Sequence, residues 1–67
     1  MFINAKDARE FVEKGNLIGK STPCRATKGM WWEVYSWNNR TVAVCMDLAG
    51  VCCGEEITLD KLSLYTD

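Results

Sequence analysis

The hydrophobic period of this chain changes once along its length, and this change constrains the fold more than any other feature. Between residues 5 and 14, apolar side chains recur at helical spacing, whereas from residue 30 onward they alternate with polar ones. A helix returns to the same face after about 3.6 residues and a strand after two. The sequence therefore predicts an α+β fold, in which an N-terminal helix is followed by a small antiparallel β-meander.

The helix is expected to span residues 5–14. Asn4 is a typical N-cap residue, and Ile3 before it can pack against Ala8 as a hydrophobic staple. One stripe of the helix is apolar: Ala5, Ala8, Phe11 and Val12. This stripe predicts a face that packs on the sheet. We expect Gly15 to end the helix in the left-handed conformation.

Residues 15–28 are rich in small and polar side chains and are expected to form a connector. One short strand within it is compatible with the sequence, either at Leu17–Ile18 or at Cys24–Thr27. The sheet is expected to occupy about 29–66 and to contain three to five short strands. An open sheet and a sheet curled into an SH3-like or Sm-like barrel both fit this pattern, and residues 1–67 are expected to form a single domain.

The first hairpin allows two registers, which differ in the face that carries the aromatic residues. A two-residue turn at Asn38–Asn39 sets Tyr35 opposite Val42, whereas a three-residue loop of 38–40 puts Val34 on the same face as Val42. Because register follows the buried pattern, the three-residue loop is favoured. In that register Trp31, Tyr35 and Trp37 lie on the face opposite Val42, while Ala43 and Cys45 lie outside the core.

The second hairpin is predicted at 47–50, with Met46 opposite Val51. We expect the core face to continue through four residues: Val51, Cys53, Ile57 and Leu59. Gly54 suggests a bulge or a sheet edge, and Cys45 and Cys52 are expected on the other face. Residues 59–65 are expected to form a helical turn that leads into a short closing strand.

Four cysteines and no histidine limit the chemistry available to these 67 residues. The N-terminal segment does not resemble a secretory signal, and no apolar run is long enough to cross a membrane, so we expect a cytoplasmic protein. Thiols there are mostly reduced, and the spacing of Cys24, Cys45, Cys52 and Cys53 lacks the closely spaced pairs of structural zinc sites. We therefore predict free thiols, with no metal and no other cofactor.

Catalysis is not expected. Histidine, the usual base at neutral pH, is absent, and the adjacent carboxylates Glu55 and Glu56 should point to opposite faces of a strand. Residues 15–22 are similar to a phosphate-binding loop, but they have three residues between the glycines instead of four, and they follow a predicted helix. The sequence thus predicts a protein that is not an enzyme.

The aromatic side chains are the strongest indication of a binding surface. Three of them, Trp31, Tyr35 and Trp37, share a strand face, with Glu33 between them. Tryptophan, tyrosine and arginine are enriched at the energetic centres of protein interfaces. The predicted partner-binding residues are Trp31, Tyr35, Trp37, Arg40, Arg25 and Lys28. If the helix covers this face, the rings are instead part of the core.

Charge is segregated along the chain although the net charge is only −1. Residues 14–40 contain five basic residues and one acidic residue, and residues 46–67 contain five acidic residues and one basic residue. Unless folding brings the two halves together, this pattern predicts a dipolar molecule that docks on a charged partner.

The leading hypothesis is a small regulator or inhibitor, of the type encoded by phages, plasmids and bacteria, that contacts a larger protein or nucleoprotein complex. The alternative is a module that binds single-stranded RNA or DNA through a basic and aromatic face, although most such modules are clearly basic. A monomer and a homodimer are both compatible with the sequence, and no membrane partner is expected.

Overall fold

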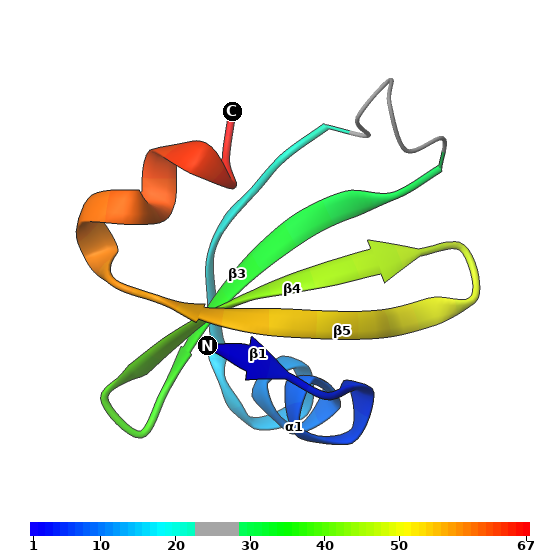
Figure 1. The fold of residues 1–67 in the computed structure, drawn as a ribbon, viewed down its shortest axis with the longest axis horizontal. Helices are drawn as coiled ribbons and strands as arrows, with labels where there is room; N and C mark the ends of the chain where they lie inside the picture. Colours follow the sequence, from blue (N-terminus) through cyan, green and yellow to red (C-terminus); the bar gives the residue numbers. More distant parts are fainter. Residues whose placement is uncertain (23–28) are drawn as a thin grey trace.

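A helix and a five-stranded sheet make up most of the molecule. Our computed structural model describes residues 1–22 and 29–67. Its elements, in chain order, are β1 (Phe2–Ile3), α1 (Ala5–Lys14), β2 (Asn16–Lys20), β3 (Trp31–Trp37), β4 (Arg40–Asp47), β5 (Gly50–Ile57) and the 3₁₀ helix η1 (Leu59–Leu64). The predicted α+β class is confirmed (Figure 1).

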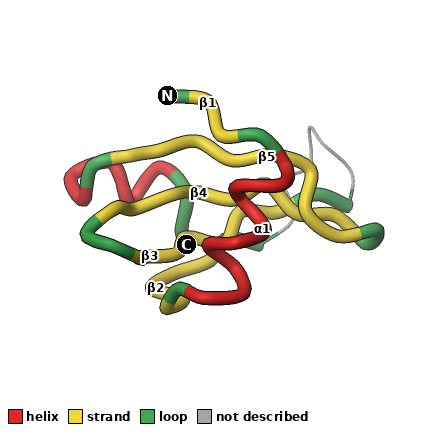
Figure 2. Tube along the Cα trace, turned by 90° about the horizontal axis from the view of Figure 1, so that it is seen from below, coloured by secondary structure: helices red, strands yellow, loops and turns green. Residues whose placement is uncertain are grey.

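The strands form one antiparallel sheet in the order β1-β5-β4-β3-β2. Figure 2 shows β1 and β2 at the two opposite edges, so the sheet is open and is not a closed barrel. The sequence reading did not anticipate β1. Its two residues pair with Glu55 and Gly54 of β5, which makes β5 an inner strand of the sheet.

The helix spans the predicted residues, and its N-cap is confirmed, because the Asn4 side-chain oxygen accepts a hydrogen bond of 2.9 Å from the Asp7 amide. The prediction for Gly15 was wrong. Gly15 has φ −90° and ψ −178°, which is extended backbone, because the chain passes directly from the helix into β2. A Cβ at Gly15 would lie 2.6 Å from the Phe11 carbonyl oxygen and 2.9 Å from that of Ser36, so close approach requires glycine here.

The expected connector contains a strand. β2 occupies residues 16–20, which includes the short strand considered at Leu17–Ile18, and its pairing with β3 shifts register between Leu17 and Gly19. The alternative position at Cys24–Thr27 lies outside the described residues. The sheet therefore begins earlier than residue 29, with β2 as its second edge.

The favoured register of the first hairpin was wrong, and the two-residue turn is correct. Trp37 pairs with Arg40 and Tyr35 with Val42. Asn38 and Asn39 have φ of 52° and 60°, the left-handed geometry of a tight hairpin turn that asparagine tolerates well. The buried pattern could not select the register, since Val34 on one face and Val42 on the other are both fully buried.

The second hairpin confirms the pairing of Met46 with Val51. The bulge, however, lies between the pairs Cys45–Cys53 and Met46–Val51 and not at Gly54, so Cys53 does not share a face with Val51. Gly54 instead allows α1 to approach the sheet, since a Cβ there would lie 3.2 Å from the Ala8 Cβ.

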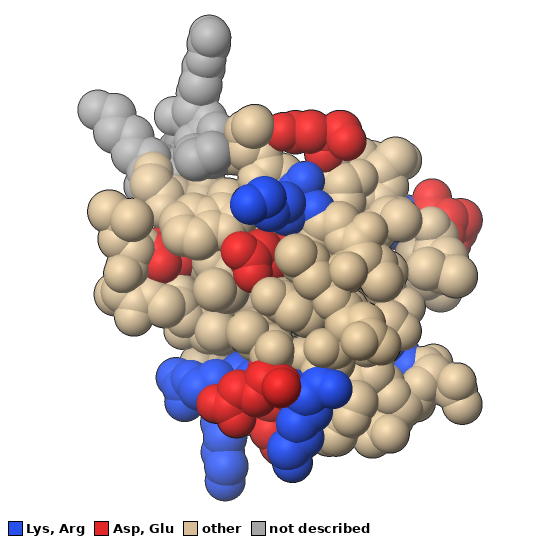
Figure 3. All heavy atoms as spheres, turned by 180° about the vertical axis from the view of Figure 1, so that it is seen from behind, with Lys and Arg blue, Asp and Glu red and all other residues tan. Residues whose placement is uncertain are grey.

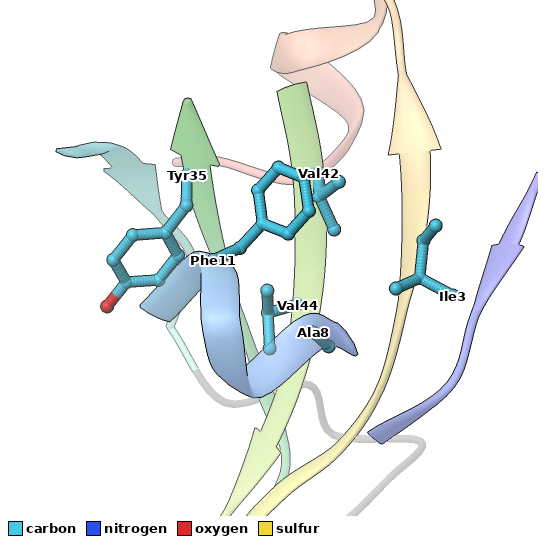
Figure 4. Close-up of a cluster of buried hydrophobic side chains, with 6 residues drawn as sticks. All are labelled: Ile3, Ala8, Phe11, Tyr35, Val42 and Val44. Carbon is cyan, nitrogen blue, oxygen red and sulfur yellow. The ribbon is translucent and has the colours of Figure 1, made fainter. Parts of the chain in front are cut away.

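The sheet is covered on both faces. On one face, α1 packs over a cluster of six buried side chains: Ile3, Ala8, Phe11, Tyr35, Val42 and Val44 (Figure 4). On the other face, η1 and the residues after it place Tyr65 against Trp32, with ring centroids 4.9 Å apart. Figure 1 shows α1 and η1 on opposite sides of the sheet.

Several expectations about burial and about the C-terminal residues were wrong because of this second layer. Ala43 and Cys45 are buried and not outside the core, whereas Leu59 is 67% exposed. The residues after η1 do not form the expected closing strand. Within the described residues, no helix is long and apolar enough to cross a membrane.

Candidate functional site

Alternate residues of β3 form the candidate site. Because side chains alternate along a strand, Trp31, Glu33, Tyr35 and Trp37 point to one face. The pairing of Tyr35 with Val42 makes this the face on which α1 packs. The predicted aromatic face is therefore on the same side of the sheet as Val42 and Val44, and not opposite them as the three-residue loop implied.

Two aromatic side chains hold one carboxylate between them. The Trp31 Nε1–H donates a hydrogen bond of 2.8 Å to Glu33 Oε2, and the Tyr35 hydroxyl donates one of 2.8 Å to Glu33 Oε1. All three residues, which we call the Glu33 cluster, lie on a single strand at two-residue spacing. This spacing places the two donors on either side of the acceptor along β3.

The donors that hold Glu33 are neutral. Burial raises the pKa of Tyr35 to about 12, with a further contribution from the hydrogen bond to Glu33, so its hydroxyl stays protonated at neutral pH. The ion pairs of the described residues are Met1–Glu55, Lys14–Glu10 and Arg40–Glu56. Glu33 belongs to none of them, although Lys20 lies opposite it in the β2–β3 pair.

The Glu33 cluster lies at the border of the helix-covered core. Figure 4 shows the Tyr35 hydroxyl oxygen pointing away from the other five core side chains. Trp31 and Glu33 are half-buried, and Tyr35 is 8% exposed. Leu17 of the edge strand β2 pairs with Tyr35 and is 51% exposed, and its neighbour Ile18 is 40% exposed. The cluster therefore adjoins an exposed apolar edge.

The surface on the β2 side of the molecule is visible from behind. In Figure 3, basic and acidic side chains gather at the lower end, where α1 lies. The surface above them is mostly uncharged, with a basic and an acidic area side by side near its middle and further acidic areas toward its borders. The distribution is typical of an interface that combines apolar contact with charged interactions.

The other predicted site residues are in different surroundings. Trp37 packs edge-on against Phe11, with ring centroids 5.3 Å apart, and the Lys14 Nζ lies 5.5 Å from its ring centroid. Arg40 pairs with Glu56 at 2.8 Å and lies over the Phe11 ring. Arg25 and Lys28 fall outside the described residues. The structure thus brings Trp31 and Tyr35 together, and it places Trp37 and Arg40 beside the helix.

Sequence reasoning noticed Glu33 but did not include it among the site residues. The signal was available, because an acidic residue that shares a strand face with Trp and Tyr on either side can accept hydrogen bonds from both. Counting charges along the chain does not reveal this role, because the partners of Glu33 are neutral donors.

A second group of functional side chains lies at the β4–β5 end of the sheet. Three free cysteines gather there: Cys45, Cys52 and Cys53. The Cys52 thiol donates a hydrogen bond of 3.1 Å to Asp47, and this raises the pKa of Cys52 to about 11. Burial also raises the pKa of Cys45. Both thiols are therefore weak nucleophiles at neutral pH.

These cysteines do not form a metal site, since no group of three or more potential ligands within residues 1–22 and 29–67 is placed to hold an ion.

A groove of about 360 Å³ lies between the end of β5 and η1. It mixes charged and apolar walls, with Glu55 and Lys61 beside Ile57 and Leu64. Neither the cysteines nor the groove brings an acid, a base and a nucleophile together.

Comparisons with protein-family models, curated proteins and solved structures find no match to this chain.

Proposed function

We propose that this protein is a non-enzymatic binding module that regulates or inhibits a larger protein or nucleoprotein complex through protein–protein contact. The observation that carries the proposal is the position of the Glu33 cluster beside the exposed apolar edge of β2. We place this activity in the cytoplasm, where the free thiols would remain reduced, and the phage, plasmid or bacterial origin suggested by the small size belongs to the same proposal.

The edge strand supports contact with a protein. The outer side of β2 has no strand neighbour in the sheet, and Leu17 and Ile18 expose apolar side chains there. Proteins usually protect such edges with charges, proline or a covering element, because an unprotected edge pairs with other chains. Among the described residues, the Asp67 amide donates a hydrogen bond of 3.3 Å to the Lys20 carbonyl, and Thr66 and Leu62 lie against Gly19, so the C-terminal residues cover this end of β2. The proposed contact with a partner is therefore at Leu17 and Ile18.

The composition and the surroundings of the thiols support a role without catalysis. The chain has no histidine. The raised pKa values of Cys45 and Cys52 argue against a cysteine nucleophile. The supported activity is therefore recognition.

A partner-capture experiment tests the proposal. The purified protein would be crosslinked in lysate of a bacterial host and its captured proteins quantified by isotope-labelled mass spectrometry. Wild type would be compared with the double variant Leu17→Ser/Ile18→Ser and with Leu48→Ser, a matched control at a side chain that is 94% exposed on the β4–β5 turn. We expect the double variant to lose a specific partner that Leu48→Ser retains. Equal capture by all three proteins would contradict the proposed surface.

A tryptophan-fluorescence titration with single-stranded RNA and DNA tests the alternative function, which is nucleic-acid binding. Stacking of bases on Trp31 should quench fluorescence, and the effect should weaken steeply with salt. We expect no saturable quenching at low salt, since Glu33 places a negative charge among the aromatic residues. Saturable, salt-sensitive quenching would instead identify nucleic acid as the partner.

A further inference from the structure

We propose that the Glu33 cluster is a receptor for one arginine side chain of the partner. The proposal rests on the proposed function and specifies the chemistry of the contact. The cluster presents a carboxylate that takes part in none of the ion pairs of the described residues, at the border between the core and an exposed apolar strand. A cation from a partner would complete this arrangement.

The number of free acceptor positions favours a guanidinium group. A carboxylate offers two oxygens with about four lone-pair positions. Trp31 occupies one position on Oε2, and Tyr35 occupies one on Oε1, which leaves room for a further hydrogen bond on each oxygen. A guanidinium presents two parallel N–H donors at the spacing of the two carboxylate oxygens. In number, the remaining acceptor positions suffice for the two parallel donors of one arginine.

The neighbouring aromatic residues also favour arginine over lysine. Trp31 and Tyr35 flank the carboxylate along β3, and both are fixed by their hydrogen bonds to it. Guanidinium is planar and weakly hydrated, so it gives up water and stacks on aromatic groups more readily than ammonium does. A partner arginine would thus gain contact with the half-buried Trp31 ring as well as charge-assisted hydrogen bonds, whereas the Tyr35 ring is buried and contributes only by holding Glu33.

Lys20 is a cation of the same chain that would compete with a partner arginine. It pairs directly with Glu33 across the β2–β3 register, so it projects on the same face, but it forms no ion pair with Glu33. Its positive charge would oppose entry of a second cation. Replacing Lys20 by alanine should therefore strengthen binding of an arginine side chain.

The test uses the indole N–H signal of Trp31 in a two-dimensional ¹H–¹⁵N NMR spectrum of the full chain. Trp31→Phe identifies this signal among those of the three tryptophans. The probes are N-acetyl-arginine amide, N-acetyl-lysine amide and N-acetyl-citrulline amide, which keeps the shape of arginine without its charge. We expect a saturable shift with the arginine probe at a Kd on the order of 1 mM. The lysine probe should bind about fivefold more weakly, because it loses one of two parallel hydrogen bonds.

Three variants separate binding from folding. Glu33→Gln should abolish the response to the arginine probe while the remaining spectrum stays dispersed, and Lys20→Ala should strengthen the response about twofold to threefold at low salt. Glu55→Gln is the matched control, because Glu55 is an exposed acid at the β1–β5 pair and should not affect Trp31. No shift with the folded wild type, or equal shifts with arginine and citrulline probes, would overturn the arginine receptor.

The outcome is distinguishable from failure of the proposed function. If the arginine probe has no effect but Leu17→Ser/Ile18→Ser still loses a captured partner, the protein contact stands and the arginine receptor is wrong. Equal binding of the lysine and arginine probes would also overturn the assignment to arginine, because it would show recognition of charge without recognition of the guanidinium plane.

Discussion

The face of the sheet beneath α1 has two regions that differ in burial: the core residues of β4 and the Glu33 cluster on the neighbouring strand β3. Under the helix, Val42 and Val44 are fully buried and contact Phe11 and Ala8. On β3, the same face carries the Glu33 cluster, with a carboxylate and two polar donors. The difference shows that burial by the helix, and not position in the sheet, decides which residues of this face are core.

The helix covers this face at one end of β3 and leaves the other end partly open. It begins directly after β1 and ends directly before β2, which are the two edge strands of the sheet. Gly54 lets the helix sit close to the sheet, and Phe11 and Lys14 near its C-terminus lie against Trp37, the last residue of β3. Trp31, the first residue of β3, is half-buried, so a polar group at this end can be satisfied and still reach a partner.

The largest expected effect is a loss of stability in the core beneath α1. Phe11→Ala should lower the free energy of unfolding by about 3–5 kcal/mol, because a buried ring is lost. A domain of this size has a total stability of about 3–5 kcal/mol, so the variant should be largely unfolded by circular dichroism. Phe11→Leu, at about 1 kcal/mol, gives a measurable intermediate. Leu17→Ala at the exposed edge strand β2 should cost less than about 0.5 kcal/mol, and equal losses at both positions would remove the distinction.

The next effect concerns pH. Tyr35 has its pKa raised from 10.0 to about 12 in the folded state, so between pH 10 and 12 the unfolded chain releases this proton while the folded chain keeps it. The contribution is complete below pH 10, and as much as about 2 kcal/mol is lost as pH rises to 12. Urea unfolding of wild type and Tyr35→Phe from pH 9 to 12 should show this loss in the wild type only. Parallel curves would mean that Tyr35 is not held by burial and Glu33.

A smaller loss of stability is expected for a change in the Glu33 cluster than for a change in the core. Glu33→Gln keeps one amide oxygen that can accept from Trp31 or Tyr35, so we expect a loss of about 1 kcal/mol in unfolding free energy. Urea unfolding followed by tryptophan fluorescence measures this change. A loss as large as that of Phe11→Ala would place Glu33 among the residues that hold the fold together.

The smallest expected effect is at Arg40. Its ion pair with Glu56 at 2.8 Å is exposed, so Arg40→Ala should lower the melting temperature only slightly, and the difference should shrink in high salt. Thermal unfolding at two salt concentrations tests this, with Arg40→Lys as the control that keeps the charge. Loss of partner capture with an unchanged melting temperature would instead support the predicted role of Arg40 in binding.

Local sequence signals predicted the elements whose causes are local. Asn4 caps the helix with its own side chain, and the stripe through Ala8 and Phe11 faces the core as the spacing requires. The second hairpin followed from a turn that begins with Asp47, whose side chain accepts a hydrogen bond from the Ala49 amide. Each of these features depends on residues within a few positions of one another.

The register of the first hairpin shows why the site was harder to predict. The three-residue loop is favoured only if one face of the hairpin is buried, but Val34 and Ala43 are as buried as Val42 and Val44. When both faces are covered, alternation no longer selects the register, and the turn decides. The choice moved Trp31 and Tyr35 to the helix side and made Glu33 their common partner.

The sequence alone therefore determined the helix, the alternating strands, the turn at 47–50 and the presence of an aromatic group around Glu33, because these follow from neighbouring residues. Only the tertiary structure decided which face each strand buries, how β1 joins the sheet, and where the bulge at Cys52 falls. It also decided that Tyr35 is buried in the core under α1 while Trp31 and Glu33 are half-buried. Such outcomes depend on contacts between residues far apart in the chain, where several packings satisfy the same local pattern and only the complete fold selects one.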